Sequence, residues 1–117
     1  MRILTFAISA LLIVTAAATA EAHAFLDHTE PRVGSTVPIA PRELVLSYTQ
    51  NLEPAFSSVE VSDANGARVD LGKLSISAST MRVGLKPLAP GTYRVRWRVL
   101  SVDTHTTEGS FTFHVGQ

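Results

Sequence analysis

The sequence contains no cysteine among its 117 residues. No disulfide can therefore tie the folded chain together, and its stability must come from packing. The same absence removes thiolates, which are the usual ligands of soft metal ions such as copper(I). Methionine is scarce as well, with only two residues. Any metal ion that the chain binds must therefore be held mainly by nitrogen and oxygen groups.

An excess of charge of either sign is also absent. Ten Lys and Arg residues balance ten Asp and Glu residues, and no polybasic run occurs. Nucleic-acid binding and electrostatic attachment to an anionic membrane both lack their usual sequence pattern. Arg94, Arg96 and Arg98 alternate along one segment, and we interpret them as the solvated face of a strand because no aromatic residue is interleaved on that face. A stripe that binds anions or nucleic acid is the alternative for these arginines.

No apolar run reaches the roughly 20 residues that a transmembrane helix needs. The apolar segment 3–18 follows Arg2 and leads into small residues that end at Ala22, which is the pattern of a cleaved secretory signal. We therefore expect residues 1–22 to be a signal peptide, removed on export to the periplasm. Residues 23–117 then form one domain, because they are too few for a second core. An uncleaved membrane anchor is the alternative.

The remaining sequence alternates apolar and polar residues in short segments separated by Pro, Gly and Asn. The clearest segment places Tyr93, Val95 and Trp97 on one face, and Asn65-Gly66 predicts a tight turn. About seven strands are expected, near residues 25–29, 43–48, 58–63, 68–74, 81–86, 92–99 and 110–115. This spacing predicts an all-β fold, namely an immunoglobulin-like Greek-key β-sandwich or barrel.

A candidate chelate lies at the predicted new N-terminus. Cleavage after residue 22 would leave His23 first, where its α-amine and its imidazole can close one ring around a metal ion. Asp103 and His105 stand at i and i+2, so an extended backbone would send their side chains to the same side. Three nitrogens and one carboxylate oxygen match the tetragonal arrangement that copper(II) prefers. The sequence therefore predicts one copper(II) site formed by His23, Asp103 and His105.

The other histidines and the second methionine receive a structural interpretation. His28 follows Asp27 directly, so a regular strand would send these side chains to opposite faces, and one could join the metal site only if the strand is irregular. His114 is expected on the polar face of the last strand, and Met81 in the core.

Motifs of several common catalytic sites are missing from the sequence. There is no G-x-S-x-G turn of the hydrolases, no glycine-rich phosphate loop after a strand and no pair of carboxylates suited to glycoside cleavage. We therefore expect a binding protein and not an enzyme.

The two ends of the expected mature chain resemble the CopC copper-resistance proteins of the bacterial periplasm. Residues 23–31, HAFLDHTEP, are similar to the H-A-x-L-x-x-S-x-P start of that family, with Thr29 in place of serine. The closing stretch is closer, with matches at residues 90–93 (PGTY), 97–99 (WRV), 101–105 (SVDTH) and 109–113 (GSFTF). The resemblance covers essentially the whole chain after residue 22, and its middle is generic.

The resemblance implies an immunoglobulin-like Greek-key β-barrel that binds one copper(II) ion through His23, Asp103 and His105. Two features depart from the family pattern. Some members place a glutamate near the ion, and the matching place here holds Gln50, which has no charged oxygen. Others carry a methionine-rich loop for copper(I), which is missing here, so we expect a protein that binds copper(II) only.

The implied role is sequestration and delivery of copper in the periplasm, by a monomer, for copper homeostasis or resistance. The resemblance also implies exchange of copper with an inner-membrane transporter of the CopD type, which this chain does not contain. Protons compete with the metal for amine and imidazole groups, whose reference pKa values are about 8 and about 6.5, so copper affinity should fall as the pH drops.

Two other functions fit parts of the sequence. A copper-dependent oxidative enzyme can hold its ion with an N-terminal histidine and a second histidine. Such enzymes expose aromatic residues to their substrate, whereas this chain has few, most of them on predicted core faces, and Asp103 would fill a position that oxygen needs. A metal-free exported β-sandwich that acts as an adhesion or assembly module is the other alternative, and it leaves the N-terminal histidine unexplained.

Overall fold

The computed structural model describes residues 24–116. The predicted signal peptide and the predicted ligand His23 lie outside the described residues. The elements in chain order are β1 (Leu26–Glu30), β2 (Thr36–Val37), β3 (Glu43–Tyr48), the short 3-10 helix η1 (Pro54–Phe56), β4 (Ser58–Ser62), β5 (Asp70–Ser77), β6 (Thr80–Leu85), β7 (Gly91–Leu100) and β8 (Thr106–Val115). Residues 24–116 contain no helix long and apolar enough to cross a membrane.

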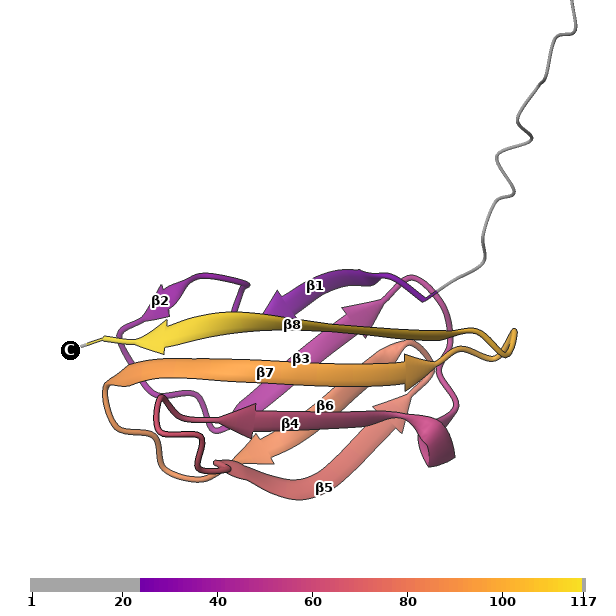
Figure 1. The fold of residues 1–117 in the computed structure, drawn as a ribbon. Helices are drawn as coiled ribbons and strands as arrows, with labels where there is room; N and C mark the ends of the chain where they lie inside the picture. The colour runs from indigo at the N-terminus through magenta and orange to yellow at the C-terminus, as the bar shows by residue number, and fades with distance from the viewer. Residues whose placement is uncertain (1–23, 117) are drawn as a thin grey trace, which may run out of the picture.

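The strands form two four-stranded sheets that pack face to face. One sheet has the order β1-β3-β6-β5 and the other has the order β2-β8-β7-β4, and Figure 1 shows the second sheet lying across the first. The chain changes sheet at every connection between strands except the hairpins β5–β6 and β7–β8. This architecture confirms the predicted all-β, immunoglobulin-like Greek-key sandwich.

The core lies between the sheets and is built from alternate strand positions. In β7, Tyr93 and Val95 are buried and Arg94 is exposed, as the sequence pattern predicts. Trp97 is half-buried on the same inner face, where its ring meets that of Tyr48 edge to face with centroids 5.3 Å apart. The largest side chains with essentially no exposure are those of Phe113, Leu44, Leu46, Met81, Val61, Val83, Val95 and Val99.

The hairpin of β7 and β8 is the element that carries the predicted metal ligands. Its strands pair without interruption from Gly91 opposite Val115 to Leu100 opposite Thr106. Gly109 lies opposite Trp97, and a Cβ atom at that position would come within 2.7 Å of the indole ring. The glycine therefore makes room for the ring, and the hairpin reaches the end of the sandwich as one continuous ladder.

Three strands differ from the sequence prediction. β5 spans Asp70–Ser77, where residues 68–74 were expected. β2 pairs in parallel with β8 over two residues only, and two residues are too few to show an alternating pattern, so the structure has eight strands where about seven were expected. β8 begins at Thr106, before the predicted start at residue 110, because its pairing with β7 continues to the turn. Residues 106–109 carry no large apolar side chain that would reveal this extension.

A buried carboxylate fastens β4 to β5. Asp70 is 5% exposed, and its Oδ2 accepts hydrogen bonds from the backbone N–H of Val61 (2.9 Å) and from Nε of Arg68 (3.1 Å). Its Oδ1 accepts from Nη2 of Arg68 (3.0 Å) and from the backbone N–H of Gly72 (2.9 Å). Burial alone would raise the pKa of Asp70, but the hydrogen bonds from Arg68, Val61 and Gly72 outweigh it and lower that pKa.

Candidate metal centre

Three segments meet at the end of the sandwich where the β7–β8 hairpin turns. They are the start of β1, the segment between β3 and η1, and the turn itself, all at the right of Figure 1. The backbone N–H of Thr49 donates to the carbonyl of Phe25 (2.9 Å), and the backbone N–H of Val102 donates to the carbonyl of Asn51 (3.0 Å). These hydrogen bonds hold the turn and the first described residues at one end of the molecule.

Ala24 is fixed beside the start of β8. It is fully buried, and its carbonyl accepts a hydrogen bond of 2.8 Å from the hydroxyl of Thr107. Thr107 follows the predicted ligand His105 by two residues. The residue that comes directly after His23 in the sequence is therefore anchored close to His105.

The two predicted ligands of the hairpin lie in a tight turn. The backbone N–H of Ser101 donates to the carbonyl of His105 (3.0 Å), and the backbone N–H of Thr104 donates to the carbonyl of Ser101 (2.9 Å). Thr104 has φ 72°, in the left-handed region that β-branched residues rarely adopt. The extended backbone predicted for residues 103–105 is therefore wrong, since the left-handed residue between Asp103 and His105 folds the chain into a turn.

The turn nevertheless places the side chains of Asp103 and His105 next to each other. Oδ2 of Asp103 lies 3.3 Å from Nδ1 of His105. Oδ1 accepts hydrogen bonds from the hydroxyl of Ser101 and from the backbone N–H of His105 (3.4 Å). Oδ2 is buried and accepts no hydrogen bond from the part of the chain that the structure describes. With Nδ1 of His105 beside it and no hydrogen bond from the described chain to satisfy it, this buried carboxylate oxygen fits the role of a metal ligand.

The carboxyl group of Asp103 is held in its charged form. The hydrogen bond from Ser101 is the main cause that lowers its pKa below the usual range, and contacts with His105 lower it further, while burial acts in the opposite direction. A deprotonated carboxylate is the form that binds a metal ion.

A second pair of Asp and His side chains lies in β1, where opposite faces were predicted, and that prediction is wrong. The pairing of β1 with β3 shifts register between Leu26 and His28, and Nδ1 of His28 lies 2.9 Å from Oδ2 of Asp27. An irregularity of this kind re-aims side chains and brings the two together. Within residues 24–116 no three His, Asp or Glu side chains are grouped so that they could hold a metal ion, so this pair stays apart from Asp103 and His105.

His114 and Met81 occupy the places predicted from the sequence. His114 lies on the polar side of β8, where its Nδ1 is 2.9 Å from the hydroxyl of Thr92. Met81 is fully buried in the core. Gln50 is partly buried in the segment between β3 and η1, which contacts the β7–β8 turn.

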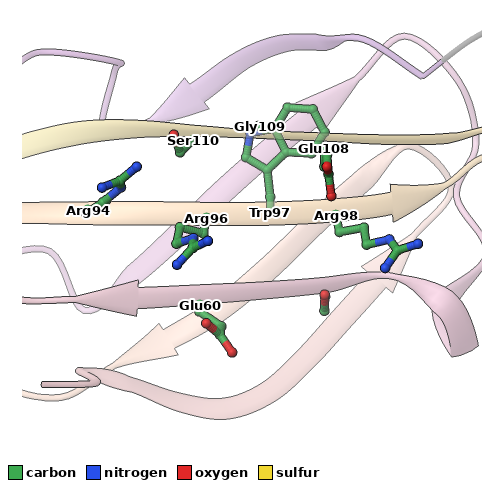
Figure 2. A pocket seen from close by; sticks show the side chains of 9 residues that line it. Glu60, Arg94, Arg96, Trp97, Arg98, Glu108, Gly109 and Ser110 are labelled. Atoms are coloured by element: carbon green, nitrogen blue, oxygen red, sulfur yellow. The ribbon is translucent and has the colours of Figure 1, made fainter. Parts of the chain in front are cut away.

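The arginines of β7 line an open hollow of about 530 Å³ on the outer face of their sheet. Figure 2 shows Arg94, Arg96 and Arg98 along β7, with Glu60 on β4 and Glu108 on β8. Arg96 pairs in register with Glu60, and Arg98 pairs with Glu108. Charges of both signs thus lie on this face, which supports its interpretation as a solvated strand surface.

Ser101 is the residue of this site that sequence reasoning did not single out. It entered only as the first letter of the SVDTH match, although its hydroxyl contacts Asp103 and its backbone contacts His105. A serine two residues before an aspartate is typical of turns with side-chain hydrogen bonds, and this was the available signal.

Comparison with other proteins places the chain among copper proteins. Residues 26–116 match the family model of the CopC domain. Copper resistance protein C of Xanthomonas campestris pv. juglandis is 35% identical over 109 residues, a match that covers 86% of this chain and 85% of the relative.

Solved structures agree with this relationship. CopC from Methylosinus trichosporium OB3b superposes with a TM-score of 0.75 at 31% identity, which covers 80% of this chain and 94% of that protein. PcoC, a methionine-rich copper resistance protein from Escherichia coli, gives a TM-score of 0.71 at 32% identity, with 80% and 99% covered. The family predicted from the two ends of the sequence is therefore confirmed over nearly all of the described domain, and the chain belongs to the CopC family.

Proposed function

We propose that this protein binds one copper(II) ion in the periplasm and delivers it to another protein. The ligands would be the α-amine and imidazole of His23, the imidazole of His105 and Oδ2 of Asp103. One observation carries the proposal: Oδ2 of Asp103 is buried, has no hydrogen-bond partner among residues 24–116 and lies 3.3 Å from Nδ1 of His105. Both atoms are close enough together to bind the same ion.

The anchoring of Ala24 supports the part assigned to His23. The hydrogen bond between Ala24 and Thr107 ties the chain directly after His23 to a strand that begins one residue after His105. Cleavage of the signal peptide after Ala22 would supply the free α-amine that the chelate requires.

The choice of copper(II) over copper(I) rests on the ligands available. The sequence has no cysteine, and Met81 is buried in the core, where its thioether packs against apolar residues. PcoC, by contrast, is described as methionine-rich. Imidazole, amine and carboxylate groups suit copper(II), so we assign one copper(II) site and no copper(I) site.

The proposed role is binding and delivery without chemical turnover. The relatives are named for copper resistance, and the acceptor would be an inner-membrane transporter of the CopD type. Phe25 and Val102, each more than half exposed, flank the candidate centre and offer apolar contacts to such a partner. We expect the copper-loaded protein itself to be a monomer.

Replacing His105 tests the site directly. The His105→Ala protein should bind copper(II) about 100-fold more weakly or worse, because it loses a ligand, and loss of a mere supporting contact already costs 10–100-fold. His114→Ala is the matched control, since it removes a partly buried imidazole from the same hairpin and should bind as the wild type does. The measurement is a competition titration of the exported protein, followed by fluorescence of the single tryptophan, Trp97.

The identity of the N-terminus decides the remaining part of the proposal. Mass spectrometry of the exported protein should show a chain that begins at His23. A mature chain that begins at Ala24 or retains Ala22 would remove the amine chelate and contradict the proposed ligand set. Equal copper affinity of the His105→Ala and wild-type proteins would also contradict it.

A further inference from the structure

Ser101 is a polar residue with no exposed surface at the base of the β7–β8 turn. Its backbone N–H donates to the carbonyl of His105 (3.0 Å), and its own carbonyl accepts from the backbone N–H of Thr104 (2.9 Å). It also forms an isolated bridge with Leu52 on the neighbouring segment. The backbone of this one residue therefore closes the turn and ties it to the rest of the sandwich.

The hydroxyl of Ser101 is directed at the ligand-bearing part of the turn. It donates to Oδ1 of Asp103, and it also lies 3.2 Å from the carbonyl oxygen of His105. A hydroxyl has one proton, and a charged carboxylate is the stronger acceptor of the two. A buried hydroxyl needs such a partner, so the contact fixes both groups at once.

This contact makes the two oxygens of Asp103 unequal. Oδ1 is occupied by the hydroxyl of Ser101 and approached by the backbone N–H of His105, whereas Oδ2 has no hydrogen-bond partner in the described chain and faces Nδ1 of His105. Turning the plane of the carboxylate away from this orientation would break the contact with Ser101. The hydroxyl therefore selects which oxygen is offered and in which direction.

The backbone of the turn adds to the need for such a contact. Thr104, between the two candidate ligands, adopts φ 72°, a conformation that a β-branched residue disfavours. The surrounding hydrogen bonds must hold it there, and Ser101 takes part in those of both flanking residues, Asp103 and His105.

We propose that Ser101 is a positioning residue of the copper site: its buried hydroxyl orients the carboxylate of Asp103 so that Oδ2 alone is presented to the ion. The inference rests on the proposed function, since it concerns the same site. Ser101 itself does not contact the metal ion. Its role is that of the outer contacts that orient ligands in metal proteins.

The test compares Ser101→Ala with Ser57→Ala. Ser57 is also a buried serine near this end of the sandwich, where its hydroxyl donates to the carbonyl of Glu53 (2.9 Å) and accepts from the N–H of Leu100 (3.2 Å). It makes no contact with the candidate ligands that the structure records. Loss of a buried hydroxyl is thus common to both variants, and loss of the contact to Asp103 is specific to one.

We expect Ser101→Ala to weaken copper(II) binding by about 10–100-fold and to change the electron paramagnetic resonance spectrum of the bound ion, because the carboxylate is free to turn. Ser57→Ala should have the copper(II) affinity and the spectrum of the wild type. Ser101→Thr keeps a hydroxyl at the position and should restore the wild-type spectrum, and it carries the test if Ser101→Ala does not fold.

Wild-type affinity and spectrum in the Ser101→Ala protein would overturn the positioning role. A folded Ser101→Thr protein that behaves like the alanine variant would overturn it as well. Failure of the proposed function is recognised separately. In that case the wild-type protein does not bind copper(II), or the His105→Ala protein measured beside it binds copper(II) as well as the wild type does.

Discussion

Asp70 and Asp103 both have a carboxyl pKa below the usual range, yet their oxygens are used differently. Each oxygen of Asp70 accepts two hydrogen bonds, from Arg68 and from backbone N–H groups. In Asp103 only Oδ1 accepts hydrogen bonds, and Oδ2 is buried without one among residues 24–116. The first carboxylate has all its hydrogen bonds within the fold, whereas the second has one oxygen that faces Nδ1 of His105 without a hydrogen bond from the described chain.

The difference separates a structural carboxylate from a candidate ligand. Four hydrogen bonds exhaust the acceptor positions of Asp70, so no atom remains to bind anything else. A buried oxygen without a hydrogen bond is destabilising, and a bound ion or water is one way in which such an atom is satisfied. We therefore expect changes at Asp70 to affect stability and changes at Asp103 to affect copper binding.

The largest effect should follow from Asp103→Asn. The substitution keeps the shape of the side chain but removes its charge, and copper(II) affinity should fall by about 100-fold or more at pH 7, as expected for loss of a charged ligand rather than of a supporting contact. Asp70→Asn should leave the affinity within about twofold, since changes remote from a site have small effects. A competition titration with a copper(II) chelator measures both.

The comparison fails if the two asparagine variants bind copper equally well. Unchanged affinity in Asp103→Asn would mean that the buried Oδ2 is not a ligand atom. A large loss of copper(II) affinity in a folded Asp70→Asn protein would mean that a fully hydrogen-bonded carboxylate at the β4–β5 connection still affects the copper site.

Asp70→Asn should have the larger effect on stability. It replaces an ionised acceptor by an amide that cannot accept from Arg68, Val61 and Gly72 together, and a hydrogen bond to a charged group contributes about 1.5–3 kcal/mol. We expect the free energy of unfolding to fall by about 2 kcal/mol, measured by urea denaturation of the metal-free protein. Asp103→Asn, denatured in the same way, should show a smaller change.

The pH dependence of the stability lost in Asp70→Asn tests whether the charge of Asp70 is the cause. The pKa of Asp70 is lower in the folded protein than in the unfolded chain, so its contribution is fully present above the ordinary aspartate pKa of about 3.9. It is lost as the pH falls through the lower pKa of the folded state. The difference in stability between wild type and Asp70→Asn should therefore be constant near pH 7 and shrink below about pH 4. A difference that does not change with pH would show that the charge of Asp70 is not responsible.

Much of the fold could be predicted from the sequence because its strands bury one face only. In β7 and at the end of β8, large apolar residues alternate with polar ones, and the period of two identifies both the strand and its inner face. β2 could not be found in this way, because it is defined by two backbone pairs with β8 and carries no pattern of its own. The irregularity in β1 was also hidden, since it depends on the partner strand β3.

The candidate site shows the same division. Residue types and spacing pointed to Asp103 and His105, but they suggested an extended backbone where Thr104 is left-handed. The position of Ala24 beside Thr107 joins residues 83 apart in the sequence, so no local pattern reveals it. Local chemistry was thus enough to nominate ligands, whereas their approach depends on contacts between distant segments.

The smallest effect is expected at the exposed pair of Asp27 and His28, which adds a third carboxylate to the comparison. Oδ2 of Asp27 lies 2.9 Å from Nδ1 of His28, and both side chains are more than 60% exposed, so solvent supplies whatever partners this pair lacks. Unlike Asp103, Asp27 has a largely exposed side chain. His28→Ala should therefore change copper(II) affinity by no more than about twofold, the size expected of a surface substitution, in the same chelator titration. A tenfold loss would show that His28 reaches the ion, and exposure would then no longer separate a ligand from a surface pair.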